Sequence, residues 1–248
     1  MHFSKNRFFK LLFILALLGS SPAIALLVIP TKLSAQDEGK ILNILGYGTA
    51  CKILGDPYPL GGYSGVEIGL EENILQTDQI SSLGSGAAQQ GQTTYNTLTL
   101  GKGIYNNIDT IVQFAFLGQT ENVSNFGGQV RWGFYQAEYL PIYLSTVAHW
   151  DSTNFANLVT TTTMGGDLIM GVHEGDVTLY LGAGIIRSMG SFAGGTGAIT
   201  ASGNTEQNGI EDNRFIVGLN FKIQKAYLAG EMDQTRLPTY AAKLGFRF

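Results

Sequence analysis

The sequence is poor in cysteine, proline and charged residues, and each scarcity excludes a class of protein. The single cysteine, Cys51, excludes a disulfide framework within the chain. It is most simply a sheltered thiol, with an intermolecular disulfide as the alternative. Charged residues make up only 14% of the chain and hydrophobic residues 44%, a balance too apolar for disorder. Beyond the N-terminal region no apolar run is long enough for a transmembrane helix. Strands of alternating character reconcile these observations.

The first 25 residues have the layout of a secretory signal peptide. Three basic residues precede an apolar run, and the small residues Ala23 and Ala25 form a cleavage site. Cleavage as late as residue 36 is the alternative, because residues 26–29 prolong the apolar stretch. An uncleaved membrane anchor fits less well, since glycine, serine and proline interrupt the run. The sequence therefore predicts an exported protein.

Charge excludes nucleic acid as a partner. Of 15 lysines and arginines in the chain, three lie within residues 1–25, so cleavage leaves 12 basic against 19 acidic residues, a net charge of −7. Nucleic-acid binding depends on basic surfaces that neutralise phosphates. We expect no nucleic-acid binding by this acidic, exported chain.

The chain ends on a strand with one apolar and one polar or small face. The first face carries Tyr240, Ala242, Leu244, Phe246 and Phe248, and the second carries Ala241, Lys243, Gly245 and Arg247. This ending resembles the C-terminal strand of bacterial outer-membrane β-barrel proteins. The resemblance implies that Tyr240, Phe246 and Phe248 belong to the signal read by the barrel-assembly machinery. It also implies a cell outer-membrane location among outer-membrane lipids.

Ten segments alternate in the same way, each near the length that a tilted strand needs to cross a bilayer. They span residues 64–70, 95–104, 110–117, 127–137, 142–150, 164–172, 177–185, 215–223, 227–232 and 239–248. We predict an all-β fold, a closed antiparallel up-and-down transmembrane barrel of about ten strands over residues 61–248. Eight or twelve strands are the alternatives.

The predicted connections alternate between short and long, which is typical of outer-membrane barrels with periplasmic turns and extracellular loops. The short ones are residues 105–108, 138–141, 174–176 and 224–225, and the long ones are 76–94, 118–126, 151–163 and 187–213; the ninth, 233–238, is brief on the long side. This pattern predicts that both termini are periplasmic.

Residues 26–60 fit the strand pattern least well. A short apolar helix is expected near residues 41–45, and the Gly55–Pro59 region breaks regular structure. We interpret residues 26–60 as a periplasmic or plug-like N-terminal segment. The competing interpretation is an additional strand pair, which would give twelve strands.

Eight charged residues alternate onto the face opposite the apolar one and are predicted to face the barrel lumen. They are the acids Glu67, Glu71, Asp167 and Glu231 and the bases Arg131, Lys222, Lys243 and Arg247. They could form salt bridges that fill a small barrel, or a constriction that selects solutes by charge. If the last strand pairs with the first, Lys243 and Arg247 should lie near Glu67 and Glu71.

A catalytic site is not expected. His149 and Asp151 project inward near the predicted extracellular end of their strand, as a pair at the barrel rim. Similar barrels include outer-membrane proteases with an Asp-x-His motif and lipid A deacylases with a His-x-Ser motif. Neither motif is matched by this chain. His173 and Glu174 have no further histidine or cysteine at metal-binding spacing. We therefore predict no enzyme activity, cofactor or metal site.

These observations favour a small narrow pore, or passive channel, for small solutes. The alternative is a structural or surface-interaction (adhesin-like) barrel that presents long extracellular loops to an unknown ligand. A hydrolase at the barrel rim is a distant third hypothesis.

Overall fold

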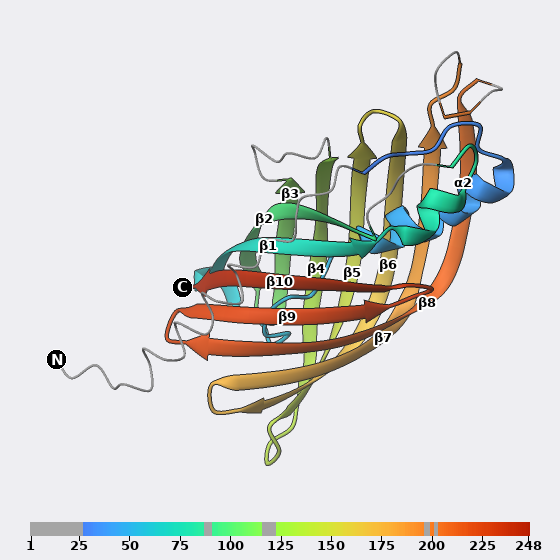
Figure 1. The fold of residues 1–248 in the computed structure, drawn as a ribbon. Coiled ribbons are helices and arrows are strands. Elements are labelled where there is room, and N and C mark those ends of the chain that lie inside the picture. Colours follow the sequence, from blue (N-terminus) through green and yellow to red (C-terminus); the bar gives the residue numbers. More distant parts are fainter. Residues whose placement is uncertain (1–26, 87–90, 116–122, 196–198, 201–202) are drawn as a thin grey trace.

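Ten strands and four short helices make up the described part of the computed structural model, which covers residues 27–248 except 87–90, 116–122, 196–198 and 201–202 (Figure 1). The predicted signal peptide lies outside the described residues. The strands are β1 Val66–Gln76, β2 Gln92–Tyr105, β3 Ile108–Ala115, β4 Val123–Gln136, β5 Ile142–Phe155, β6 Val159–Glu174, β7 Val177–Phe192, β8 Thr205–Ile223, β9 Ala226–Gln234 and β10 Pro238–Arg247. The helices are α2 Ala35–Ile41, the π-helix η1 Leu42–Gly46 and the 3₁₀ helices η2 Gly62–Ser64 and η3 Asp78–Ser82.

Every strand pairs antiparallel with its neighbours in sequence, and β1 pairs with β10 to close the barrel (Figure 1). The closing register runs from Glu67 opposite Arg247 to Ile74 opposite Tyr240. Closure leaves no open sheet edge, because every strand finds a partner on both sides. The predicted all-β closed barrel is confirmed with ten strands rather than eight or twelve.

The two ends of the barrel differ in their connections, and we name them accordingly. The turn end carries the short turns, including Asn106 and Gly175 with positive φ, and the C-terminal residue Phe248. The loop end carries the other connections, including residues 77–91 and 193–204. One predicted long loop is wrong. Residues 151–163 are the two arms of the β5–β6 hairpin, joined by a turn at residues 156–158.

The strands extend further towards the loop end than the apolar alternation indicated. Outward positions there are polar, such as Ser152 and Asn154 on β5 and Thr160 and Thr162 on β6. Backbone pairing nevertheless continues to Phe155 opposite Val159. Apolar residues at every second position mark a strand face that is buried or in contact with lipid. Where water lies outside the barrel, this pattern disappears, although the backbone hydrogen bonds between the strands continue.

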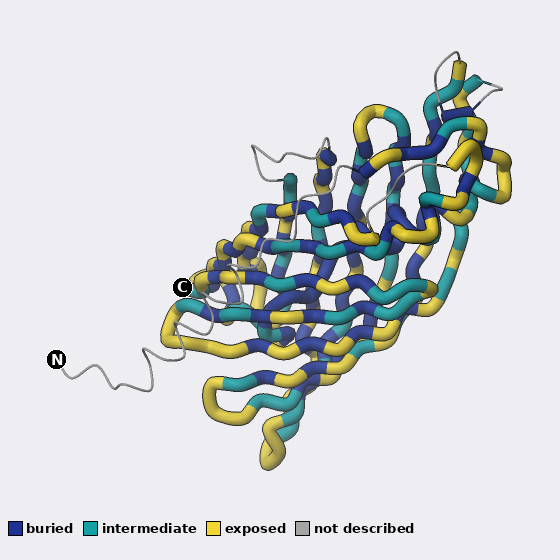
Figure 2. Tube along the Cα trace, in the orientation of Figure 1, coloured by how far each residue is buried: buried dark blue, intermediate teal, exposed yellow. Residues whose placement is uncertain are grey.

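Buried and exposed residues alternate along the strands (Figure 2), and apolar side chains are prominent among the exposed ones, unlike in a water-soluble protein. On β4, the outward Val130 and Trp132 are 47% and 51% exposed, whereas the inward Gln129 and Arg131 are buried. The same alternation of exposed and buried residues repeats around the barrel; the exposed side chains are largely apolar, and the buried ones include the charged residues together with apolar ones such as Val147, Ile169 and Ile216. Within the described residues, no helix is both long and apolar enough to span a bilayer.

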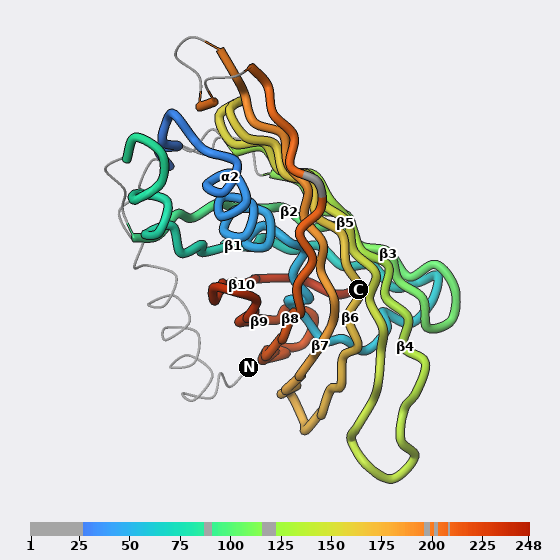
Figure 3. Tube along the Cα trace, turned by 90° about the vertical axis from the view of Figure 1, so that its right-hand side faces the viewer, coloured from blue at the N-terminus to red at the C-terminus, as the bar shows by residue number. Residues whose placement is uncertain are grey.

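Residues 27–60, which we call the N-terminal segment, lie on the inner side of the strand wall (Figure 3). Helix α2 starts at a capping box, in which the Ser34 hydroxyl accepts from the Asp37 amide and the Asp37 carboxylate accepts from the Ser34 amide. After η1 the chain runs through the lumen as irregular backbone, and residues 44–55 are all buried. Leu60 reaches Asp109 at the start of β3, beside the turn end.

The two ends of the described chain lie at opposite ends of the barrel. Leu33 donates its amide to Ile199, and Thr31 contacts Ser85, so the start of the N-terminal segment lies at the loop end. Phe248 pairs with Val66 at the turn end. The N-terminus itself lies outside the described residues, so the prediction that both termini are periplasmic stays a prediction. Within the described residues, the N-terminal segment crosses the lumen from the loop end to the turn end before β1 begins.

Candidate functional site

The barrel lumen is the candidate functional site, because it gathers the buried charges and holds the N-terminal segment. Glu231 on β9 accepts hydrogen bonds from the backbone amides of Ile53 (3.1 Å) and Leu54 (2.8 Å). The hydroxyl of Tyr180 on β7 donates to the same carboxylate at 2.7 Å. Two amides that no strand could reach are thus satisfied by one inward carboxylate.

Asp56 is held from three strands. Its carbonyl accepts from Arg131 Nη1 of β4 at 3.0 Å and from Arg247 Nη2 of β10 at 2.8 Å. Its carboxylate accepts from the hydroxyl of Tyr143 on β5 at 2.6 Å. The lumen polar groups therefore hold the backbone as well as the side chain of the N-terminal segment.

Arg131 links Asp56 to Asp109 at the start of β3, beside the turn between β2 and β3. Its Nη2 lies 3.0 Å from Asp109 Oδ2, and both residues are buried. Asp109 also accepts from the Leu60 amide at 3.0 and 3.1 Å. The ion pair between β3 and β4 thus anchors the point where the N-terminal segment leaves the lumen.

Arg214 is the centre of a second network in mid-lumen. Its Nη1 lies 3.0 Å from Asp167 Oδ2, and its Nη2 lies 2.6 Å from Asp233 Oδ2. The same Nη2 donates to the Cys51 carbonyl at 2.8 Å. Lys52 Nζ meets Asp233 from the N-terminal segment, also at 2.6 Å. A completely buried guanidinium is thereby surrounded by carboxylates from β6 and β9 and by the segment itself.

The closing seam carries a third network. Arg247 Nε lies 2.6 Å from Glu67 Oε2, and Lys243 Nζ lies 2.8 Å from Glu67 Oε1 and 3.2 Å from Glu71 Oε1. The expected cross-strand pairing of these four charges is confirmed. Each acid lies directly opposite a base in the register of β1 and β10.

Inward glycines make room for inward tyrosines on the adjacent strand. A Cβ built on Gly218 would lie 2.0 Å from the Tyr180 ring, and equivalent clashes of 2.3 Å occur at two other sites. Each glycine lies directly opposite its tyrosine: Gly171 with Tyr143, Gly218 with Tyr180, and Gly245 with Tyr227. Inward glycines thus accommodate large neighbours. Of these tyrosines, Tyr143 binds Asp56 of the N-terminal segment, and Tyr180 binds Glu231, which holds that segment.

The predicted rim pair is not at the rim. His149 and Asp151 are buried inside the barrel, because β5 continues to Phe155. His149 Nε2 lies 3.4 Å from Asp167 Oδ2 and 3.2 Å from Arg214 Nη1. The thiol of Cys51, itself buried as expected of a sheltered cysteine, is beside them. The basis of the rim-hydrolase hypothesis is therefore removed.

All eight predicted lumen charges have the inward orientation, but they are not equivalent. Six are buried: Glu67, Glu71, Arg131, Asp167, Glu231 and Lys243. Arg247 is half-buried, and Lys222 is exposed at the turn end. The three residues of the predicted assembly signal, Tyr240, Phe246 and Phe248, are exposed on the outer surface.

Among the described residues, sequence reasoning missed five buried charges, namely Glu38, Lys52, Asp109, Arg214 and Asp233. Arg214 and Asp109 fell one residue outside their predicted strands, and Asp233 was assigned to a connection. The alternation of faces along a strand could have found two of them, because residues two positions apart point to the same side. Asp233 is two residues from the inward Glu231, and Arg214 is two residues from the inward Ile216. No local pattern marked Lys52, which lies in irregular backbone.

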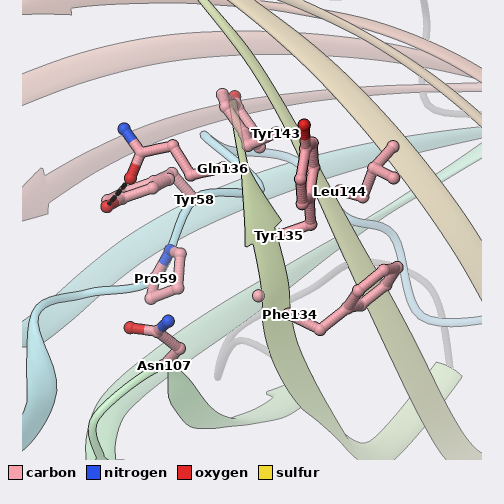
Figure 4. A pocket seen from close by; sticks show the side chains of 9 residues that line it. Tyr58, Pro59, Asn107, Phe134, Tyr135, Gln136, Tyr143 and Leu144 are labelled. Atoms are coloured by element: carbon pink, nitrogen blue, oxygen red, sulfur yellow. Dashed lines mark hydrogen bonds between the residues drawn. The ribbon is translucent and has the colours of Figure 1, made fainter. Parts of the chain in front are cut away.

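The lumen offers little free space. A cavity of about 50 Å³ at the turn end is shown in Figure 4, where Tyr58 donates to Gln136 beside Pro59 and Asn107. A second, of about 20 Å³, borders Asp56, Lys222 and Arg247. Both cavities are small and lie at the turn end.

Comparisons with known proteins give no family for the chain. No protein-family model matches it, and no curated protein matches it. Solved structures similar to it include the N-terminal β-barrel domain of Pseudomonas aeruginosa OprF, with 11% identity over 76% of this chain and 99% of that one at a TM-score of 0.38.

Two further solved structures are similar at the same low level. Ail, the attachment invasion locus protein of Yersinia pestis, has 13% identity over 74% of this chain and 97% of its own at a TM-score of 0.32. Neisserial surface protein A (NspA) has 11% identity over 77% of this chain and 96% of its own, at a TM-score of 0.31. The strand pairing within this chain, rather than these scores, establishes the closed barrel. The chain is thus similar to bacterial outer-membrane β-barrels, with no specific family matched.

Proposed function

We propose that this protein is an integral outer-membrane β-barrel that its own N-terminal segment keeps closed, and that it acts as a structural or surface-presenting barrel rather than as a passive channel. The observation that carries the proposal is the polar attachment of residues 51–60. Carboxylates, arginines and a tyrosine from β3, β4, β5, β8, β9 and β10 bind this stretch within the lumen.

The outer surface supports a membrane location. Every strand except β9 presents at least one large apolar side chain that is more than a third exposed. Such a continuous apolar surface is unfavourable in water and favourable against lipid tails. Aromatic pairs flank it, with Trp132 and Phe134 towards the turn end and Phe126 and Trp150 towards the loop end. Aromatic girdles at both interfaces are typical of outer-membrane barrels.

The height of the apolar surface fits a bilayer. On β5 it runs from Ile142 to Trp150, after which the outward residues Ser152 and Asn154 are polar. At a rise of about 3.3 Å per residue and a tilt of about 40°, this stretch spans about 23 Å. The apolar band of outer-membrane barrels is about 25 Å tall. The strand ends beyond this band would then stand in water at the loop end.

A passive pore would require the N-terminal segment to leave the lumen. Removal would strip Glu231 of two amide donors and leave the carboxylates around Arg214 without Lys52. Buried polar groups that lose their partners cost about 1–3 kcal/mol each, and more when charged. A ten-stranded barrel is slightly wider than one that side chains alone can fill. The N-terminal segment supplies the missing volume, so the closed state is the stable one.

The proposal predicts no conductance. The signal-free chain, refolded into vesicles, is transferred to planar bilayers, and insertion is verified by flotation and by heat-modifiable electrophoretic mobility. We expect no ohmic steps from the inserted protein. Steady ohmic conductance from the unmodified chain would overturn the closed-barrel proposal in favour of the narrow pore.

Orientation is measured with the same chain in a Gram-negative host. Ser82 is exposed in the loop-end helix η3, and Glu138 is exposed in a turn-end connection. A membrane-impermeant maleimide applied to intact cells should label Ser82→Cys and spare Glu138→Cys, because only the loop end would face the medium. The native Cys51 is buried and should not add to the labelling. The opposite labelling would reject extracellular loops. Failure of both variants to reach the outer-membrane fraction would reject the location.

A further inference from the structure

Three metal-ligating side chains meet at one point in mid-lumen. Cys51 comes from the N-terminal segment, and His149 and Asp151 come from the same face of β5. One ligand atom from each, the thiol sulfur, an imidazole nitrogen and a carboxylate oxygen, all lie within 4.8 Å of one another. All three residues are at most 5% exposed.

The hydrogen bonds of this cluster are incomplete among the described residues. The Cys51 backbone amide lies near the Asp151 carboxylate, but neither carboxylate oxygen has a partner in hydrogen-bond geometry, and His149 Nδ1 has none. The Cys51 thiol donates weakly to the carbonyls of Trp150 at 3.5 Å and Gly128 at 3.7 Å. A buried carboxylate without a partner is strongly unfavourable, and native proteins pair such groups or use them to hold a metal.

We propose that Cys51, His149 and Asp151 bind one divalent transition-metal ion of the zinc class. Thiolate sulfur, imidazole nitrogen and carboxylate oxygen are the ligands that Zn²⁺ takes in proteins. Calcium and magnesium take all-oxygen ligand sets, so a sulfur and nitrogen pair disfavours them. The ligand atoms, all within 4.8 Å of one another, are close enough to share one ion at ordinary metal–ligand distances near 2.0–2.3 Å.

The surroundings of His149 suit this role. With its proton on Nε2, the imidazole donates towards Asp167 Oδ2 at 3.4 Å and leaves the Nδ1 lone pair free for the metal. This tautomer gives up the hydrogen bond that Arg214 Nη1 otherwise donates to Nε2 at 3.2 Å. A carboxylate behind the histidine is the usual arrangement at metal sites, where it orients the ring and raises its basicity. Metal binding through Nδ1 therefore requires the tautomer with the proton on Nε2. In this tautomer Arg214 still pairs with Asp167 and Asp233.

Charge balances at the site. The Cys51 thiol loses its proton to solvent on binding, and the resulting thiolate with the Asp151 carboxylate offsets the two charges of the ion. The nearby Arg214 is already offset by Asp167 and Asp233. No redox step is involved.

The ion would join the N-terminal segment to the barrel wall, since one ligand comes from the segment and two from β5. This inference goes beyond the proposed function and does not depend on it, because a metal can bind whether or not the barrel conducts.

Cobalt supplies a direct test with the full signal-free chain, without an affinity tag, refolded in detergent. Co²⁺ bound by thiolate shows a sulfur-to-metal charge-transfer band, and Cys51 is the sole cysteine of the chain. We expect this band to rise to one equivalent of Co²⁺ and to disappear when one equivalent of Zn²⁺ is added. Absence of the band at saturating Co²⁺ in correctly folded protein would overturn the proposal.

Variants sharpen the result. Cys51→Ser and Asp151→Asn should each weaken Zn²⁺ binding by at least the roughly 10–100-fold that loss of a supporting group typically causes. The matched control is His173→Ala, which removes the other histidine of the signal-free chain at the turn end; its Zn²⁺ affinity should be unchanged. Equal affinity of the Cys51→Ser protein, or equal loss in the control, would show adventitious binding only. If a variant fails to fold, the cobalt spectrum of the unmodified chain decides alone.

Discussion

The two ends of the N-terminal segment are held by opposite kinds of interaction. Towards the loop end, Ile41, Leu42 and Leu45 pack into an apolar core with side chains such as Phe155 and Phe192 from the barrel wall. Towards the turn end, residues 51–60 are held by carboxylates, guanidinium groups and tyrosine hydroxyls. One continuous peptide thus passes from a hydrophobic core into a polar network.

The difference follows from the surroundings of each half of the wall. At the loop end the outer strand positions are polar, as at Ser152 and Thr162, so the inner face can be apolar as in a water-soluble protein. Further down, the outer positions are largely apolar, and the inner ones carry the buried charges beside small apolar clusters around Ile53 and Leu54. There the backbone of the N-terminal segment has no strand partner, and inward side chains must satisfy it. Burial and polarity invert together along the barrel axis.

Removal of Arg214 should have the largest effect. Arg214→Leu leaves Asp167 and Asp233 buried with less compensating charge, and breaking a buried ion pair in this way costs about 3–5 kcal/mol. We expect a loss of that size in the free energy of unfolding, measured by urea titration of the refolded barrel in vesicles.

The matched control is Arg236→Leu, which breaks the solvent-exposed pair with Asp212 at 2.8 Å. Exposed pairs contribute about 0–1 kcal/mol. Equal losses in the two arginine variants would contradict the view that the polar half depends on its buried charges.

Truncation of Leu42 probes the apolar half. Leu42 is fully buried and lies so close to Gly190 that a Cβ there would be 2.3 Å from its Cδ2. Leu42→Ala should cost about 2–4 kcal/mol through lost burial and the cavity left behind. Leu140→Ala in a turn-end connection, where the side chain is 60% exposed, should change the urea midpoint little. A small effect at Leu42 would mean that the loop-end core does not contribute to holding the segment.

The capping box of α2 should give the smallest effect. Hydrogen bonds from Ser34 hold the pKa of Asp37 below its usual value. A lowered pKa in the folded state contributes stability that is present above the unfolded pKa and is lost as the pH falls through the folded pKa. Ser34→Ala should therefore cost about 0.5–1 kcal/mol at pH 7. The difference from the unmodified protein should shrink as the urea titration is repeated below pH 4. A constant difference would assign the effect to something other than this pair.

Much of the fold was predictable because the relevant signals are local. Alternation of period two marked all ten strands, and it also gave the inward orientation of the lumen charges. Pairing of Lys243 and Arg247 with Glu67 and Glu71 followed once the last strand was assumed to meet the first. The error at residues 151–163 arose because the apolar alternation ends at Trp150. Beyond it the outward residues, such as Ser152 and Asn154, are polar, so a continuing strand was predicted as a loop.

The occupant of the lumen was not predictable in the same way. Nothing in the sequence around Lys52 or Asp56 indicates that their partners are Asp233 and Arg131, far away along the chain. Such contacts depend on the stagger of ten strands and on the path of an irregular segment, and neither has a period. The meeting of Cys51 with His149 and Asp151 has the same origin, since only closure of the barrel around the segment brings them together.

The sequence by itself determined a barrel with apolar outward and polar inward faces, because side-chain alternation is a property of each strand alone. Only the tertiary structure decided that the barrel is filled, which charges meet, and at which end the N-terminal segment enters. Those outcomes depend on the lumen of a ten-stranded barrel being wider than its own side chains can fill, which leaves room for one peptide and requires polar partners for its backbone.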